Sequence, residues 1–259
     1  MKVVILCGGQ GTRLREETEV RPKPMVEIGG RPILWHIMKL YAHHGFAEFV
    51  LCLGYKGYII KDFFLNYEAR MKDVTVRLGS REVKFHNGHD EDGWSITLAE
   101  TGESAMTGAR LHRVRRYLDS GPFCLTYGDG LGDVNITDLI RFHRSHGKLA
   151  TVTGVRPPGR FGELELDGRK VSAFAEKPQV TSGFSNGGFF VFEREFLDRY
   201  LEDRDDLTLE GEPLQRLAAD GQLMVWEHDG FWQPMDTYRE WKTLEGLWET
   251  GRAPWKVWD

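Results

Sequence analysis

Residues 2–13 read KVVILCGGQGTR, and this stretch decides the fold. The apolar run at 3–7 is typical of a strand buried on both faces of a parallel sheet, and the glycines after it end the strand. Residues 32–41 then carry apolar side chains at helical spacing and stop near Gly45, and 48–53 is a second apolar run. Together these segments predict a strand–helix–strand unit.

The same alternation continues along the chain. Residues 123–127 and 150–155 indicate further buried strands, with a helix near 138–146 between them. We therefore predict an α/β fold with a doubly wound, mostly parallel, Rossmann-like sheet that has helices on both faces. Residues 74–100 indicate a small antiparallel excursion. A C-terminal helix and aromatic-rich tail at 237–259, whose tryptophans suit packing or subunit contact, should pack on the main domain at 1–236.

The glycine-rich loop at 8–13 predicts a polyphosphate site. Because glycine has no Cβ, the backbone N–H groups of Gly8, Gly9 and Gly11 can approach phosphate oxygens closely. Arg13 and Lys23, a lysine between two prolines, add positive charge after the same loop. The alternative interpretation is a tight strand-to-helix turn followed by surface cations.

Two better-known phosphate loops do not fit. A Walker A loop needs GxxxxGK followed by Ser or Thr, and no such pattern follows Gly8. The dinucleotide fingerprint GxGxxG would place a small residue where this chain has Leu14. The mismatch at Leu14 argues against an NAD-dependent oxidoreductase.

Composition and charge narrow the class of protein. The formal net charge is -5 over 259 residues, which argues against a nucleic-acid-binding face. Apolar runs are far shorter than a membrane span, and the first residues form a strand rather than a signal peptide, so we expect a cytoplasmic protein with no membrane association. The three cysteines, Cys7, Cys52 and Cys124, are expected to be reduced core thiols because none is paired in a CxxC pattern. The histidine pairs at 43/44, 86/89 and 143/146 lack the spacing of a metal site.

Two aspartates are candidates for a metal site. Asp129 follows the strand that ends at Tyr127, at the carboxyl edge where open α/β sheets bind ligands. Asp236 lies in the late segment QPMDT, and magnesium takes one or two carboxylates together with phosphate oxygens and water. The other interpretation of Asp236 is a helix N-cap, because a helical segment follows it.

The segment at 8–25, GGQGTRLREETEVRPKPM, matches without a gap the signature of the sugar nucleotidyltransferase family, and the chain resembles that family over essentially its whole length. TGESAMTGARL at 101–111 and GFWQPMDT at 230–237 resemble the glucose-1-phosphate cytidylyltransferase branch in particular. Ala109 departs from that branch, which usually has glycine there. A Cβ at this position would cost energy if the backbone took a positive φ or approached the base.

The resemblance implies an activity. A member of this branch would use Mg²⁺ to convert CTP and α-D-glucose 1-phosphate into CDP-glucose and pyrophosphate, and would supply deoxysugars for bacterial surface polysaccharides. It would be a homo-oligomer. The alternatives are a UTP- or dTTP-using enzyme of the same fold and a non-catalytic nucleotide-sugar sensor.

The resemblance also implies roles for particular residues. Arg13 would neutralise the departing pyrophosphate, Lys23 would contact the phosphates at the reacting centre, and Lys177 would hold the sugar phosphate. The implied metal ligands are Asp129 and Asp236. The implied nucleotide-binding set is Leu6, Cys7, Gly8, Gly9, Gln10, Gly11, Thr12, Arg13, Lys23, Ser104, Ala109 and Gly128. The implied sugar-phosphate set is Gly162, Glu176, Lys177, Asn186 and Gly187.

Overall fold

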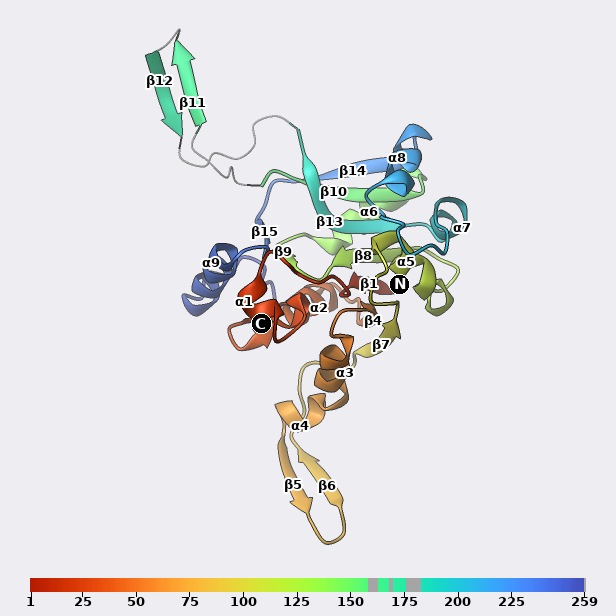
Figure 1. The fold of residues 1–259 in the computed structure, drawn as a ribbon, viewed down its shortest axis with the longest axis vertical. Coiled ribbons are helices and arrows are strands. Elements are labelled where there is room, and N and C mark those ends of the chain that lie inside the picture. The colour runs from red at the N-terminus through yellow and green to blue at the C-terminus, as the bar shows by residue number, and fades with distance from the viewer. Residues whose placement is uncertain (158–162, 168–169, 176–182, 259) are drawn as a thin grey trace.

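A central sheet organises the chain in the computed structural model, which describes residues 1–157, 163–167, 170–175 and 183–258 (Figure 1). Within these residues the sheet has seven strands in the order β14-β10-β13-β8-β1-β4-β7. Neighbouring strands are parallel except where β13 pairs with β8 and β10. The predicted, mostly parallel sheet is thereby confirmed. The strands are β1 (Val3–Leu6), β4 (Glu48–Leu53), β7 (Ser95–Glu100), β8 (Phe123–Tyr127), β10 (Ala150–Val155), β13 (Ser185–Phe192) and β14 (Leu223–His228).

Helices cover both faces of this sheet. Val3 and Ile5 of β1 face one apolar cluster, to which α2, α6 and α9 contribute, whereas Val4 and Leu6 face a second cluster containing residues of α5, α7 and α8. Because successive side chains of a strand point to opposite faces, one apolar run serves both clusters. The helices are α1 (Arg15–Thr18), α2 (Ile33–His43), α3 (Gly57–Leu65), α4 (Tyr67–Met71), α5 (Thr107–Val114), α6 (Ile136–His146), α7 (Glu195–Tyr200), α8 (Glu212–Ala219) and α9 (Tyr238–Glu249), with 3₁₀ turns η1 (Lys23–Met25) and η2 (Arg115–Tyr117).

Short antiparallel pairs extend from this framework. The expected excursion is present as a hairpin of β5 (Asp73–Arg77) and β6 (Glu82–His86), which projects away from the body (Figure 1). The expectation is wrong for residues 95–100, because β7 pairs in parallel with β4 and belongs to the central sheet. The remaining pairs are β2 (Glu27–Ile28) with β3 (Arg31–Pro32), β9 (Gly130–Gly132) with β15 (Trp232–Pro234), and β11 (Glu163–Asp167) with β12 (Lys170–Ala175).

The C-terminal segment packs into the core. Thr237 begins α9 with a capping box, in which its side chain accepts from the Glu240 N–H and Glu240 caps the Thr237 N–H. Trp255 is fully buried, and its indole N–H donates to Nδ1 of His36 on α2. The domain boundary at 236 stays a prediction, and residues on both sides of it share one core.

The three cysteines are buried and free, as expected. Over the residues that the structure covers, no helix is both long enough and apolar enough to cross a membrane.

Candidate active site

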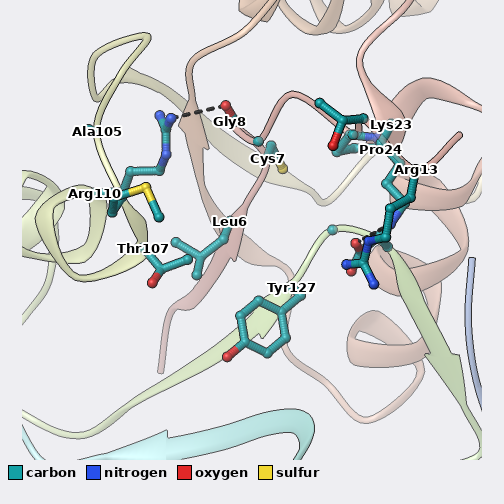
Figure 2. Close-up of a pocket in the computed structure, with 16 residues that line it drawn as sticks. Leu6, Cys7, Gly8, Arg13, Lys23, Pro24, Ala105, Thr107, Arg110 and Tyr127 are labelled. Carbon is teal, nitrogen blue, oxygen red and sulfur yellow. Dashed lines mark hydrogen bonds and ion pairs between the residues drawn. The ribbon is translucent and has the colours of Figure 1, made fainter. Parts of the chain in front are cut away.

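A cavity of about 290 Å³ lies at the carboxyl ends of β1 and β8, beside the first turn of α5 (Figure 2). This is the edge of the sheet at which the sequence predicts a ligand site. The lining residues are Leu6, Cys7, Gly8, Gly9, Gly11, Thr12, Arg13, Lys23, Pro24, Ala105, Met106, Thr107, Arg110, Tyr127, Gly128 and Asp129.

Two structural features explain why glycine occupies positions 8 and 11 of the loop. Gly11 has φ +64°, the left-handed region that favours glycine. At Gly8, a Cβ would lie 2.1 Å from the guanidinium of Arg110, so a side chain here would displace that group from its hydrogen bonds. The close neighbour of Gly8 is therefore an arginine of the protein itself, which lines the same cavity.

Arg110 has no local signal in the sequence, yet it supports the loop. Its buried guanidinium donates to the carbonyls of Gly8 (3.0 Å), Leu53 (3.0 Å) and Gly102 (2.7 Å). Burial lowers the pKa of this guanidinium from its ordinary value, although the carbonyl acceptors suit its charged form. Arg110 thus joins three loops around one end of the cavity.

Four predicted residues form a compact charged cluster. Nζ of Lys23 lies 2.6 Å from Oδ2 of Asp129 and 2.5 Å from Oδ1 of Asp236. Arg13 reaches the other oxygen of Asp236 at 2.6 Å. These residues come from the glycine-rich loop, the η1 turn, the end of β8 and the start of α9. Segments more than two hundred residues apart in the sequence therefore supply one site.

The backbone fixes both aspartates. The N–H of Met235 donates to the carbonyl of Asp129 at 2.8 Å, which ties the two acidic segments together. The N–H of Asp236 donates to Oε2 of Glu240 at 2.8 Å, so the capping box of α9 also orients Asp236. Two carboxylates that converge on one ammonium also suit one divalent cation, because Mg²⁺ prefers carboxylate oxygens.

Three residues of the predicted nucleotide set lie away from the cavity lining. Gln10 is exposed, and exposed Ser104 directs its hydroxyl toward Asp205 at 3.5 Å. Ala109 is fully buried within α5, where its N–H donates to the carbonyl of Leu207 at 3.1 Å. Because α5 has ordinary helical backbone at this position, the Cβ of Ala109 is accommodated by packing. Their roles in nucleotide binding stay predictions.

The predicted sugar-phosphate residues divide into two groups. Gly162, Glu176 and Lys177 lie outside the described residues. Asn186 and Gly187 begin β13 beside Tyr127, whose hydroxyl is 3.4 Å from the Asn186 amide nitrogen. A Cβ on Gly187 would lie 2.6 Å from Cγ1 of Val155, so packing alone requires glycine there.

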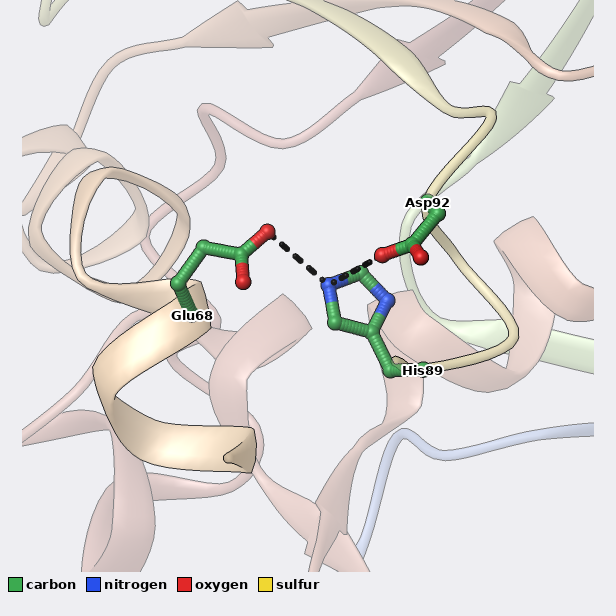
Figure 3. Close-up of side chains that lie close together, drawn as sticks. All are labelled: Glu68, His89 and Asp92. Atoms are coloured by element: carbon green, nitrogen blue, oxygen red, sulfur yellow. Dashed lines mark hydrogen bonds and ion pairs between the residues drawn. The ribbon is translucent and has the colours of Figure 1, made fainter. Parts of the chain in front are cut away.

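A second polar cluster lies at the base of the hairpin (Figure 3). Nε2 of His89 is 3.2 Å from Oε1 of Glu68 and 3.2 Å from Oδ1 of Asp92, and these three side chains could hold a cation. However, Nζ of Lys72 already lies 2.5 Å from Glu68 and 3.5 Å from Asp92. Lys72 thus offsets one of the two carboxylate charges, and the cluster is an ion-pair network between α4 and the segment that follows the hairpin.

The chain is similar to known proteins over nearly its whole length. The pattern shared by nucleotidyl transferases matches residues 2–237. The chain belongs to the nucleotidyl transferase family. It is 54% identical over 260 residues to glucose-1-phosphate cytidylyltransferase of Salmonella typhi, with 100% of each chain covered. It is 43% identical to a probable glucose-1-phosphate cytidylyltransferase of Bacillus subtilis, again over 100% of both chains.

Solved structures of nucleotidyl transferases and related proteins share the fold. A putative glucose-1-phosphate thymidylyltransferase from Bacillus anthracis superposes with a TM-score of 0.70 at 18% identity, covering 95% of this chain and 94% of its own. HddC from Yersinia pseudotuberculosis gives a TM-score of 0.69 at 22% identity, covering 95% and 99%. At these identities the likeness concerns the fold alone.

Proposed function

We propose that this nucleotidyl transferase moves the cytidylyl group of CTP to α-D-glucose 1-phosphate, which gives CDP-glucose and pyrophosphate. The full-length identity of 54% to a glucose-1-phosphate cytidylyltransferase carries the proposal. The cluster of Arg13, Lys23, Asp129 and Asp236 beside the glycine-rich loop supports it, because it gathers the charges that such a reaction needs. The product would supply deoxysugars for bacterial surface polysaccharides, and the reaction would be cytoplasmic.

The chemistry is a single displacement at phosphorus. An oxygen of the sugar phosphate, already anionic at neutral pH, forms a bond to the α-phosphorus of CTP. The bond from that phosphorus to the bridging oxygen breaks, and pyrophosphate leaves with the electron pair. Because no proton has to be removed from the nucleophile, the protein must chiefly align two anions and offset their repulsion.

The residues of the cavity divide these tasks. The loop of Gly8, Gly9 and Gly11 would receive the phosphates, and exposed Arg13 would neutralise the departing pyrophosphate. Lys23, whose side chain is 8% exposed, would exchange its carboxylate partners for phosphate oxygens at the reacting centre. Lys177 would hold the phosphate of the sugar phosphate. Its sugar hydroxyls would form hydrogen bonds with Glu176, Asn186 and Gly187.

Asp129 and Asp236 would hold Mg²⁺. When bound, this ion would offset the negative charge of the triphosphate. Asp129→Asn and Asp236→Asn should each lower turnover by orders of magnitude without unfolding the protein.

The proposal includes a homo-oligomer, supported by the exposed hairpin. Val74, Val76, Val83 and Phe85 form one apolar face, with each side chain 40–51% exposed. A two-stranded hairpin with such a face is marginal alone in water, so a partner surface would stabilise it. The charged residues of its strands are Asp73, Arg77, Glu82 and Lys84. Their charges sum to zero, so a second copy of the hairpin would not be repelled.

The decisive experiment is pyrophosphate release by the purified protein with glucose 1-phosphate and Mg²⁺, using CTP, UTP, dTTP, ATP and GTP in turn. CTP should be the best substrate, with UTP next and the purines poor. A clear preference for UTP or dTTP would withdraw the cytidylyl assignment and leave only the family.

A further inference from the structure

An acidic side chain outside the predicted site holds two residues that line the cavity. Glu210 accepts a hydrogen bond from the Tyr127 hydroxyl through Oε1 and another from the Thr107 hydroxyl through Oε2, the latter at 2.6 Å. Thr107 and Tyr127 both line the cavity, whereas Glu210 is not among its lining residues. One carboxylate therefore joins the first turn of α5 to the end of β8.

The ring of Tyr127 also packs against the segment Asn186–Gly188, which is part of β13. Gly188 has φ +79°, and a Cβ there would lie 2.5 Å from Cδ2 of Tyr127. The Asn186 amide nitrogen is 3.4 Å from the Tyr127 hydroxyl. Tyr127 thus lies between the phosphate cavity and the segment Asn186–Gly188. The proposed function assigns sugar binding to this segment.

The segment that carries Glu210 is docked firmly against α5. The N–H of Gly108 donates to the carbonyl of Leu207 at 2.9 Å, and the N–H of Leu209 donates to the Thr107 hydroxyl at 2.8 Å. Gly108 permits this approach, because a Cβ there would lie 2.9 Å from the Leu207 carbonyl oxygen. Glu210 is exposed, but its backbone is therefore held in place and its two hydrogen bonds can have a fixed geometry.

We propose that Glu210 is a positioning residue for the sugar-phosphate side of the reaction. The Glu210 carboxylate fixes the position of the Tyr127 hydroxyl relative to the phosphate cavity. The Tyr127 ring, which packs against the segment Asn186–Gly188, is thereby fixed as well. This inference rests on the proposed function and adds to it a residue outside the cavity. Its chemistry requires Tyr127 to be a donor. In the structure that hydroxyl donates to Oε1 of Glu210.

The test compares Glu210→Gln and Tyr127→Phe with the unmodified protein, varying each substrate while the other is saturating. Each variant should raise the KM for glucose 1-phosphate about tenfold, as expected for loss of a hydrogen bond to a charged group. The KM for CTP should change less than about threefold, because the glycine-rich loop, Arg13 and Lys23 are unaffected. The loss in the double variant should be smaller than the product of the two single losses, because the Tyr127–Glu210 bond is affected in both.

A matched pair at Thr107 provides a rescue. Thr107→Val keeps the shape and removes the hydroxyl donor, whereas Thr107→Ser keeps the donor, so only the valine variant should show the raised KM. Glu212→Gln, two residues along and paired with Arg204 at 2.9 Å, is the control that should leave both KM values unchanged.

Two results would overturn the inference: an unchanged KM for glucose 1-phosphate in Glu210→Gln, or losses that multiply in the double variant. The nucleotide assay of the unmodified protein decides the proposed function separately. The Glu210 comparison is then made with whichever nucleotide that assay finds best, as a ratio to the unmodified protein. A double-mutant cycle on unfolding by urea checks the Tyr127–Glu210 coupling without any substrate, and zero coupling there would also contradict it.

Discussion

Lys23 determines the charge balance of the site. Its ammonium is nearly buried and lies between the carboxylates of Asp129 and Asp236. A buried charge is stable only with partners of opposite charge. Lys23 and the two aspartates therefore offset one another's cost of burial. In the proposed reaction, binding of a polyphosphate and a divalent cation would replace these internal ion pairs with new ones.

Replacing Lys23 by Met should have opposite effects on turnover and on Mg²⁺ binding. Turnover should fall by roughly a hundredfold or more, because a preorganised cation at the reacting phosphates is lost. Without that ammonium the two aspartates repel each other, so the variant should bind Mg²⁺ more tightly and gain more thermal stability from it than the unmodified protein. Isothermal titration and thermal unfolding with and without Mg²⁺ measure this. Weaker Mg²⁺ binding in the variant would show that the aspartates do not share one ion.

At the scale of elements, the N-terminus of α9 connects stability with the site. Thr237→Ala removes the capping hydroxyl and should cost about 1 kcal/mol in the free energy of unfolding, whereas Thr237→Ser should retain most of it. Because Glu240 also holds the N–H of Asp236, the alanine variant should lose turnover as well. Urea unfolding and the pyrophosphate assay test both parts, and normal turnover in a destabilised alanine variant would contradict the link.

The sequence predicted those elements whose signal is local. The buried strands at 48–53, 123–127 and 150–155 were predicted with the bounds that the structure gives, because each is a short run of mostly apolar or β-branched residues. The antiparallel direction of β13 and the return of β7 to the sheet depend on pairing between distant segments, which a single strand does not encode. The glycine-rich loop, Lys23 and Asp129 were predicted from local pattern and meet in one cavity. Arg110 and Glu210 were missed because their partners lie far away in sequence.

At the scale of the whole molecule, we expect self-association through the apolar face of the hairpin. Val76→Asp and Phe85→Asp place charge on its apolar face and should convert an oligomer into smaller species, as measured by light scattering after gel filtration. Thr75→Asp adds the same charge to the opposite face of the hairpin and should leave the assembly intact. Dissociation by all three variants alike would mean that general charge, and not this face, controls the assembly.

The buried His36 side chain should make the free energy of unfolding fall at acidic pH. Burial lowers its pKa from 6.5 to about 4, and its ring is neutral, with Nε2 donating to the Ile28 carbonyl and Nδ1 accepting from Trp255. Since the unfolded chain binds this proton more readily, stability should be full above pH 6.5 and fall toward pH 4, by about 1.4 kcal/mol per pH unit. His36→Gln should flatten this part of the pH profile of urea unfolding, and an unchanged slope would assign the dependence to other groups.

The contact between His36 and Trp255 also bears on the order of events during synthesis. The two residues are 219 positions apart. Although α2 and its flanking strands are made early, the space that Trp255 fills beside His36 stays open until 219 further residues have been translated. Asp236, which completes the charged cluster, also emerges late. A nascent chain should therefore expose apolar surface around α2 for most of its elongation, and chaperone binding would be concentrated there until the tail arrives.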